Sequence, residues 1–350
     1  MKPKSAADES HFSAALFRPM PELLVIKPSS LGDIVHALQV VASLKAQQPD
    51  WRVSWIVRDI FAPLVRSSTV VDQIFVFRRQ EGVGGFFRLM KEVRQRRFDA
   101  AIDMQGLLRS GLMIKWTHAA RKIGRADARE GATLFYDEKI KLPPRGQTHA
   151  VEILLQFCTA LGAQPELREP LRFREMEKLN LSFMDPLRGQ APILMFPDSR
   201  REEKKWGGFG LFSAMLAREA GRKVVWAGNA YIPCKEAFPE GSFVNLTGNT
   251  SLTSLAAIMA KADWVVSNDS GPMHLAAALG VKTLGIFGPT DPRLYGPYPL
   301  TSPTNHVIQA PVGDLRLLTA KEVLARFRRI EATLRGESHH SAAPFPQNRG

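Results

Sequence analysis

The segment 262–280 constrains the possible folds of this chain more than any other part of its sequence. It begins with an apolar run at 264–266, and such a run is typical of a buried parallel strand. Small polar residues interrupt the run, and an alanine-rich helix follows. Open α/β sheets bind their ligands where a strand passes into a helix in this way. The chemically distinctive residues at this point are Asp269, Ser270, Gly271 and His274.

The same alternation of short apolar runs and helical patterns recurs along the chain in two series. In the first series, strands are predicted at 23–26, 53–57, 74–77 and 98–103, with helices at 34–47, 86–97 and 150–161. In the second, strands are predicted at 193–196, 223–228, 264–266 and 283–288, with helices at 209–219, 252–261, 271–280 and 320–334. Repeated βαβ units indicate an α/β fold with parallel sheets. We therefore expect two Rossmann-like domains that face each other across a cleft.

A charged, proline-containing stretch at 167–189 separates the two series and is the expected connector between domains. We place an amino-terminal domain at 21–180 and a carboxyl-terminal domain at 190–335. The ends of the chain, 1–20 and 336–350, are rich in polar residues and are expected to be disordered tails.

Composition narrows the class of partner. The net charge of +13 favours an anionic partner, which can be a nucleic acid, a membrane surface or a phosphorylated substrate. The two cysteines are isolated in sequence, so neither a disulfide framework nor a cysteine-rich metal site is expected. No run approaches the roughly 18 apolar residues that a membrane span requires. The first twenty residues lack the apolar core of a secretory signal, so a cytoplasmic protein is expected.

The loop before the helix at 34–47 is small and polar, and Asp33 ends it. Asp33 is either a helix cap, which gains about 1 kcal/mol from free N–H groups, or a general base. Ser29, Ser30 and Gly32 would let a ligand approach the backbone. The loop is not a Walker A motif, because no Gly-Lys-Ser or Gly-Lys-Thr follows. The ammonium of Lys27 would pair either with an anionic substrate or with Asp103.

Seven segments together resemble one known family, the ADP-heptose:lipopolysaccharide heptosyltransferases. The resemblance extends from residue 23 to residue 335, and the segments occur in the order that the family has. Those at 25–38 and 269–274 are the most specific. The segments are 25–38, 103–107, 134–136, 149–152, 204–206, 267–274 and 287–292.

This resemblance implies a GT-B glycosyltransferase that inverts the anomeric centre and uses no metal or other cofactor. Asp33 would be the general base that deprotonates the acceptor hydroxyl. Lys204 would help catalysis by stabilising the charge that develops on the leaving diphosphate. The residues that would bind the ADP-heptose donor are Ser199, Arg200, Lys204, Asp269, Ser270, Gly271 and His274.

The resemblance also implies a lipid A-linked 3-deoxy-octulosonic acid (Kdo) acceptor, docked on the amino-terminal domain. An arginine fork pairs well with phosphate and carboxylate groups, which makes the arginines after predicted strands candidates for acceptor binding. The candidates are Lys27, Ser29, Ser30, Gly32, Arg109 and Arg129, with Arg125 considered beside them. The helix at 86–97 is basic and amphipathic. It either packs on the sheet with its charges in solvent, or it contacts lipid headgroups at the inner face of the cytoplasmic membrane.

Three alternative functions compete with this interpretation. A GT-B enzyme for another nucleotide sugar and glycan stays open, because Asn229-Ala230-Tyr231 stands where the family has an acidic residue near the ribose. An NAD-type oxidoreductase would need a Gly-x-Gly-x-x-Gly turn followed by an acidic residue, and the sequence has neither. A nucleic-acid-binding module would need a recognisable motif or a stacking platform. No nucleic-acid partner is therefore expected. The remaining histidines lack ligand spacing, so no metal site is expected.

Overall fold

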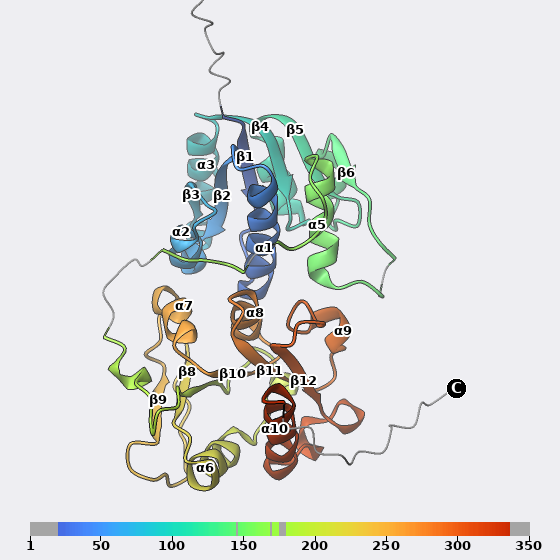
Figure 1. Ribbon diagram of the computed structural model, residues 1–350. Helices are drawn as coiled ribbons and strands as arrows, with labels where there is room; N and C mark the ends of the chain where they lie inside the picture. The colour runs from blue at the N-terminus through green and yellow to red at the C-terminus, as the bar shows by residue number, and fades with distance from the viewer. Residues whose placement is uncertain (1–19, 145, 169, 175–179, 337–350) are drawn as a thin grey trace, which may run out of the picture.

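The computed structural model describes residues 20–144, 146–168, 170–174 and 180–336. It contains two six-stranded sheets, and each sheet is flanked by helices on both faces (Figure 1). The predicted tails, 1–20 and 336–350, lie outside the described residues except for Met20 and Gly336. Across the described ranges, no helix is both long and apolar enough to cross a membrane.

The first sheet has the strand order β3-β2-β1-β4-β5-β6, and every pair of neighbours is parallel. Its strands are β1 (Glu22–Ile26), β2 (Arg52–Arg58), β3 (Gln73–Phe77), β4 (Arg97–Asp103), β5 (His118–Arg125) and β6 (Glu138–Ile140). The helices of this half are α1 (Leu31–Gln47), α2 (Ala62–Ser67), α3 (Gly82–Val93), α4 (Leu108–Lys115) and α5 (Ala150–Ala160).

The second sheet has the strand order β12-β11-β10-β7-β8-β9 and is also parallel throughout. Its strands are β7 (Ile193–Phe196), β8 (Val224–Gly228), β9 (Phe243–Thr247), β10 (Trp264–Asn268), β11 (Lys282–Phe287) and β12 (Asn305–Gln309). Its helices are α6 (Phe209–Ala220), α7 (Leu252–Ala260), α8 (Gly271–Ala278), α9 (Pro292–Tyr295) and α10 (Ala320–Leu334). Counted from the first strand of each half, both sheets have the Rossmann order 3-2-1-4-5-6.

Strand alternation divides the buried residues between the two faces of each sheet. In β1, Leu23 and Val25 face α1 and α5, whereas Leu24 and Ile26 face α3 and α4. In the second half, α6 and α10 cover one face around Trp264, and α7 and α8 cover the other. The core beneath α1 and α5 continues without a break into the core beneath α7 and α8. One apolar cluster therefore spans both halves.

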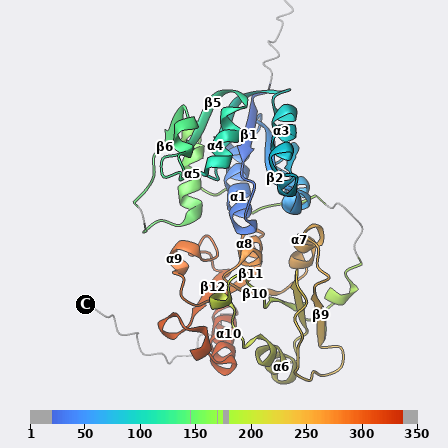
Figure 2. The ribbon, with the colours of Figure 1, turned by 180° about the vertical axis from the view of Figure 1, so that it is seen from behind.

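The two halves meet through helices rather than through their sheets. Helix α1 packs on α8, and α2 packs on α7. Figures 1 and 2, which show opposite sides of the molecule, both place α1 directly above α8. Helix α1 follows β1, and helix α8 follows β10. The contact between the two helices therefore joins the carboxyl-end edge of one sheet to the carboxyl-end edge of the other.

The expectation of two parallel Rossmann-like sheets is confirmed, with differences at individual elements. The helix predicted at 86–97 is α3 and runs from Gly82 to Val93, because three glycines in its first turn hide the start of the pattern. Strand β5 was not predicted, since its sequence HAARKIGR carries charges where an apolar run is expected. Strands β6, β9 and β12 and the short helices α2, α4 and α9 were not predicted either.

Phe327 offers a test of the core under α10. Its side chain is completely buried and packs edge-to-face on Trp264 and Phe212. We expect Phe327→Ala to lower the free energy of unfolding by about 3–5 kcal/mol, because the substitution leaves a cavity. Phe87, which is 52% exposed on α3, serves as the control. We expect Phe87→Ala to cost about 1 kcal/mol or less. Urea unfolding would measure both, and similar losses in the two variants would contradict this account of the core.

Candidate functional site

The polar residues singled out in the sequence lie where the strand order of each sheet reverses. The reversal falls between β1 and β4 in the first sheet, and between β7 and β10 in the second. Connections leave in opposite directions at such a point, so a crevice opens at the carboxyl ends of the two strands. Lys27 and Asp103 stand at the first reversal, and Asn268 and Asp269 at the second.

Asp33 lies in the first turn of α1 and is held by its neighbours. Its Oδ2 atom accepts hydrogen bonds from the backbone N–H of Ser30 at 2.9 Å and from the Ser30 hydroxyl at 2.7 Å. Its Oδ1 atom lies 3.7 Å from Nζ of Lys27. Lys27 is buried and also donates to the carbonyl of Met104. Of the two partners considered for Lys27, Asp103 is not the carboxylate with which it forms an ion pair, and pairing with an anionic substrate stays a prediction. The carboxylate that pairs with Lys27 is Asp33.

These contacts decide the protonation state of Asp33. Partial burial raises its pKa, but the charge of Lys27 and the hydrogen bonds from Ser30 outweigh burial, so the net pKa is lowered. Half of the side-chain surface remains accessible. Asp33 is therefore a helix cap by geometry and, at neutral pH, an ionised carboxylate that a ligand can reach.

A second carboxylate, Asp103, is fully buried behind Lys27. It accepts hydrogen bonds from the N–H groups of Gln105 and Gly106 and from the Tyr136 hydroxyl at 2.7 Å. Burial raises the pKa of Asp103, and burial together with Asp103 raises the pKa of Tyr136. Asp103 thus fixes the loop after β4. The pairing with Tyr136 was not predicted, although both residues fall in the family-like segments.

In the second half, Asp269 is the first residue after β10, and it forms an ion pair with Lys204. Oδ2 of Asp269 accepts from Nζ of Lys204 at 2.5 Å and from the Thr290 hydroxyl at 2.7 Å. Lys204 closes a short 3-10 turn (Glu202–Lys204) after β7. Both side chains are largely enclosed, at 16% exposed for Lys204 and 7% for Asp269. The predicted donor-binding residues Lys204 and Asp269 therefore form one ion pair.

The other predicted donor-binding residues take different positions. Ser270 precedes α8, and its hydroxyl lies 3.0 Å from that of Ser267. Ser199 is buried in the loop after β7, whereas Arg200 is exposed. Asn268 fixes that loop, because its amide binds the carbonyl of Pro197 and the N–H of Trp206. Ser199 therefore belongs to a well-anchored loop, and Arg200 extends from it.

The two halves of the site touch through glycines at the helix starts. A methyl group built on Gly32 would lie 2.8 Å from Cδ2 of His274, and one built on Gly271 would lie 2.8 Å from the Leu31 side chain. Any larger residue at either position would push α1 and α8 apart. The two glycines therefore permit the approach that brings His274 of the second half beside Asp33 of the first.

His274 is buried between the two carboxylates, and its charge state follows from that position. Burial lowers its pKa, and Asp269 and Asp33 only partly oppose the shift. Its Nδ1 atom lies 3.0 Å from Nε2 of His36 on α1. His36 was not predicted as a functional residue; its presence in segment 25–38 was the only signal.

The predicted acceptor arginines, Arg109 and Arg129, are exposed, and their described contacts are with residues other than Asp33. Arg109 lies in the first turn of α4 with its guanidinium over the ring of Phe77. Arg129 follows β5, and its N–H binds the carbonyl of Gly106. Arg125, by contrast, pairs with Asp127, and its charge acts on Lys27 and Asp33. Arg125 is therefore within electrostatic reach of the base candidate, Asp33.

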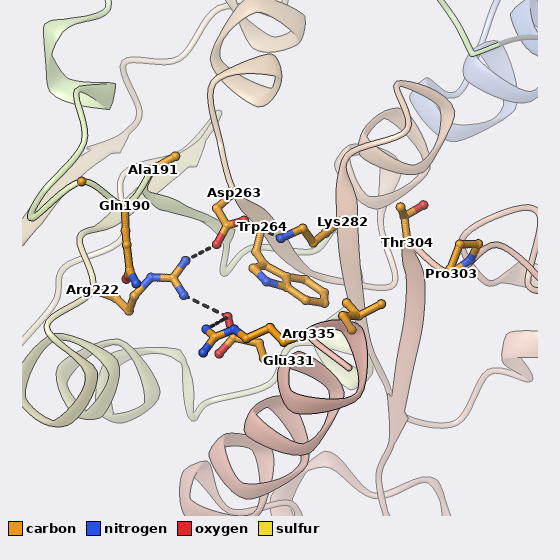
Figure 3. Close-up of a pocket in the computed structure, with 12 residues that line it drawn as sticks. Gln190, Ala191, Arg222, Asp263, Trp264, Lys282, Pro303, Thr304, Glu331 and Arg335 are labelled. Carbon is orange, nitrogen blue, oxygen red and sulfur yellow. Dashed lines mark hydrogen bonds and ion pairs between the residues drawn. The ribbon is translucent and has the colours of Figure 1, made fainter. Parts of the chain in front are cut away.

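A cavity of about 550 Å³ lies away from all these residues, at the amino ends of the strands of the second sheet. Figure 3 shows its charged groups facing one another. Arg222 pairs with Asp263 and Glu331, and Lys282 also pairs with Asp263. Because these charges are satisfied internally, we do not assign the cavity to the chemistry.

Comparison with known proteins identifies the family. The model of glycosyltransferase family 9 (heptosyltransferase) matches residues 86–311. The lipopolysaccharide core heptosyltransferase OpsX of Haemophilus influenzae is 28% identical over 81% of this chain and 84% of that protein. Lipopolysaccharide heptosyltransferase 1 of Escherichia coli K12 is 27% identical over 87% of this chain and 98% of that protein.

Solved structures agree with the fold. The E. coli heptosyltransferase WaaC with ADP has a TM-score of 0.75 and 25% identity, covering 88% of this chain and 99% of its own. The E. coli ADP-heptose lipopolysaccharide heptosyltransferase II has a TM-score of 0.69 and 22% identity, covering 91% of this chain and 100% of its own. The expected GT-B arrangement is thereby confirmed.

The capping role of Asp33 can be measured without any substrate. We expect Asp33→Ala to lower the free energy of unfolding by about 1 kcal/mol, because Ser30 loses its hydrogen-bond acceptor. Asp33→Asn, which keeps an acceptor oxygen, should cost less. Folding lowers the pKa of Asp33, so the stabilisation by its charge is present above the unfolded value of about 3.9 and is lost as pH falls through the folded pKa. Urea unfolding at pH 7 and below pH 4 would test this, and equal stability of all three proteins at pH 7 would refute the cap.

Proposed function

Since the chain belongs to glycosyltransferase family 9, the heptosyltransferases, we propose that it transfers a heptose from ADP-heptose to the Kdo–lipid A inner core of lipopolysaccharide. The names of its relatives support this proposal, because they are heptosyltransferases of lipopolysaccharide. The similar WaaC structure also holds ADP, the nucleotide that such a donor would leave behind. We do not propose a different nucleotide sugar, since none of these relatives favours one.

The observation that carries the proposal is a row of groups across the contact between α1 and α8. An accessible carboxylate, Asp33, stands at one end, and the Lys204–Asp269 ion pair stands at the other. His274 lies between them. A base on one side and a cation with helix N–H groups on the other are what transfer from a sugar diphosphate needs.

Asp33 is the proposed general base. Its Oδ1 atom would take the proton of the acceptor hydroxyl while that oxygen forms a bond to the anomeric carbon. The bond from that carbon to the diphosphate oxygen breaks on the opposite face, its electron pair leaves with ADP, and the centre is inverted. Lys27 keeps Asp33 ionised before the reaction.

The leaving diphosphate would be stabilised by groups of the second half. The amino end of α8 presents backbone N–H groups and the positive end of its dipole, beginning at Gly271. Lys204 would supply the full positive charge, held in place by Asp269. Ser199, Ser270 and Arg200 would complete the donor site. We propose that these cations and donors do the work that a metal ion does in other transferases.

The acceptor would dock on the first half, on the side of Asp33. Ser29, Ser30 and Gly32 form the loop nearest to the base, next to Lys27. The exposed Arg109 and Arg129 are placed to receive phosphate or carboxylate groups of a charged acceptor. We add Arg125 to this set, because its charge already acts on Asp33.

We further propose that the surface of α3 and the start of α4 contacts the membrane that holds a lipid-linked acceptor. Val83, Phe87 and Leu108 are exposed there at 72%, 52% and 43%. Phe87 packs against Trp116, which gives the surface an aromatic base. Exposed Arg88, Lys91 and Arg94 on α3 and its end, together with Arg109, suit anionic headgroups.

The activity is tested by ADP release from purified protein supplied with ADP-heptose and deacylated Kdo–lipid A, with EDTA present. We expect acceptor-dependent release that EDTA does not abolish. Asp33→Asn should lower kcat by about 100-fold or more, because it removes the base but keeps the cap. Asp314→Asn is the matched control, since Asp314 also caps a helical turn but lies on a separate exposed segment. Normal release by Asp33→Asn would sink the base assignment.

Membrane contact is tested by sedimentation with phosphatidylglycerol vesicles. We expect binding that falls at high salt and weakens about fivefold in Phe87→Glu, since a charge replaces an apolar group at the interface. Leu211→Glu is the control, because Leu211 has comparable exposure, 48%, but lies on α6 of the other half. Equal weakening in both variants, or no binding by the wild type, would remove the membrane surface from the proposal.

A further inference from the structure

Three imidazole rings cluster where the two halves meet, and they come from three different elements. His36 lies on α1, His149 precedes α5, and His274 lies on α8. The ring centres of His36 and His274 are 4.3 Å apart, and those of His36 and His149 are 5.6 Å apart. All three side chains are buried. The cluster therefore joins the first half of the molecule to the second through ring nitrogens as well as through apolar contacts.

His149 has its tautomer fixed by its own surroundings. The backbone N–H of Val151 donates to its Nδ1, so Nδ1 must carry a lone pair. Its Nε2 therefore carries the hydrogen and donates to the carbonyl of Gly296 at 3.1 Å. The ring also stacks on Tyr298. His149 holds the two halves together but has no hydrogen bond to His36 or His274.

His274 is different, because its tautomer depends on its partner. Burial lowers the pKa of His36 and of His274, and His149 lowers both further, so both are neutral near pH 7. A neutral imidazole has a single N–H group. The contact of His36 Nε2 with His274 Nδ1 at 3.0 Å contains one such hydrogen, which belongs to one of the two rings.

Which of the two rings donates this hydrogen decides whether Nε2 of His274 is a hydrogen-bond donor or an acceptor. Within the residues that the structure describes, Nε2 of His274 has no protein hydrogen-bond partner, and its edge of the ring packs on Gly32. If His36 donates, Nε2 of His274 carries a hydrogen and is a donor. If His274 donates, its Nε2 is a lone pair. Asp33, Asp269 and Lys204 act on this ring from the two sides.

We propose that His36 is a positioning residue: its Nε2–H donates to Nδ1 of His274 and so fixes the Nε2–H tautomer of His274 as a hydrogen-bond donor to an anionic diphosphate oxygen. This inference rests on the proposed function, because that function places the diphosphate at the amino end of α8. A lone pair directed at an anion would repel it, whereas an N–H group binds it. His36 acts through His274 and touches no substrate itself.

The arrangement also makes donor binding depend on the contact between the halves. The hydrogen that sets the tautomer comes from α1, and the group that it sets belongs to α8. His274 of the second half alone would distribute its hydrogen between both nitrogens. Only when α1 packs on α8 is the Nε2–H form selected.

The tautomer is measured directly by nitrogen-15 NMR of the full chain labelled at histidine, with no ligand present. We expect Nε2 of His274 to be protonated and Nδ1 to be a lone pair in the wild type. His36→Leu should return His274 to a mixture of tautomers. His36→Gln, whose amide N–H occupies the place of Nε2, should keep the wild-type signal. A protonated Nδ1 on His274 in the wild type would overturn the inference.

Function is measured by titrating the same proteins with ADP and by ADP-release kinetics. We expect His36→Leu to weaken ADP binding and kcat/KM on the order of tenfold, as for loss of a hydrogen bond to a charged group. His36→Gln should recover most of the loss. Gln39→Leu is the matched control, because it also replaces a buried polar side chain of α1, one turn further along, and should change neither value by more than about twofold. Equal losses in His36→Leu and Gln39→Leu would mean a purely structural role.

The two measurements separate this inference from the proposed function. If the wild type shows the expected tautomer but does not bind ADP, the assignment of the donor fails and the His36–His274 relation stands. If the wild type binds ADP and both nitrogens of His274 become protonated on binding, the ring acts as a cation and the inference fails. If His36→Leu binds ADP as the wild type does, the inference also fails.

Discussion

The rest of the structure depends on one contact, in which the amino ends of α1 and α8 meet. Each helix end carries a partial positive charge, so two such ends in contact repel each other. Carboxylates compensate on both sides, with Asp33 in the first turn of α1 and Asp269 just before α8. Gly32 makes room for the ring of His274, and Gly271 makes room for the side chain of Leu31. Each of these carboxylates is also paired with a lysine, so the side-chain charges balance and the positive backbone ends remain available to an anionic ligand.

The two carboxylates have similar partners but different surroundings. Each is paired with a lysine, Asp33 with Lys27 and Asp269 with Lys204. Asp33 keeps half of its surface accessible and holds its lysine at 3.7 Å, whereas Asp269 is enclosed and binds its lysine at 2.5 Å. A group that must accept a proton from an incoming molecule needs access. A group that must hold a cation in place needs close contact, and burial strengthens that contact.

The sequence predicted the architecture well, because a buried parallel strand leaves a continuous apolar run such as 193–196 or 264–266. It failed at β5, where only part of the strand is buried and charges break the run. Asp33 and the segment 269–274 could be found because each lies at a strand–helix junction. The pairs Lys204–Asp269 and His36–His274 could not, since their members are 65 and 238 positions apart. No local pattern records which residues far apart in the sequence will meet.

The apolar core that runs unbroken from one half into the other restricts how the molecule can move. Swinging the halves apart on a hinge would expose the faces of α1, α2, α7 and α8 to water, at about 25 cal/mol for each Å² of apolar surface. Sliding these helices along one another keeps that surface covered. Entry and release of large ligands in such a molecule are therefore expected to proceed by shear between packed helices, with small displacements shared among many side chains.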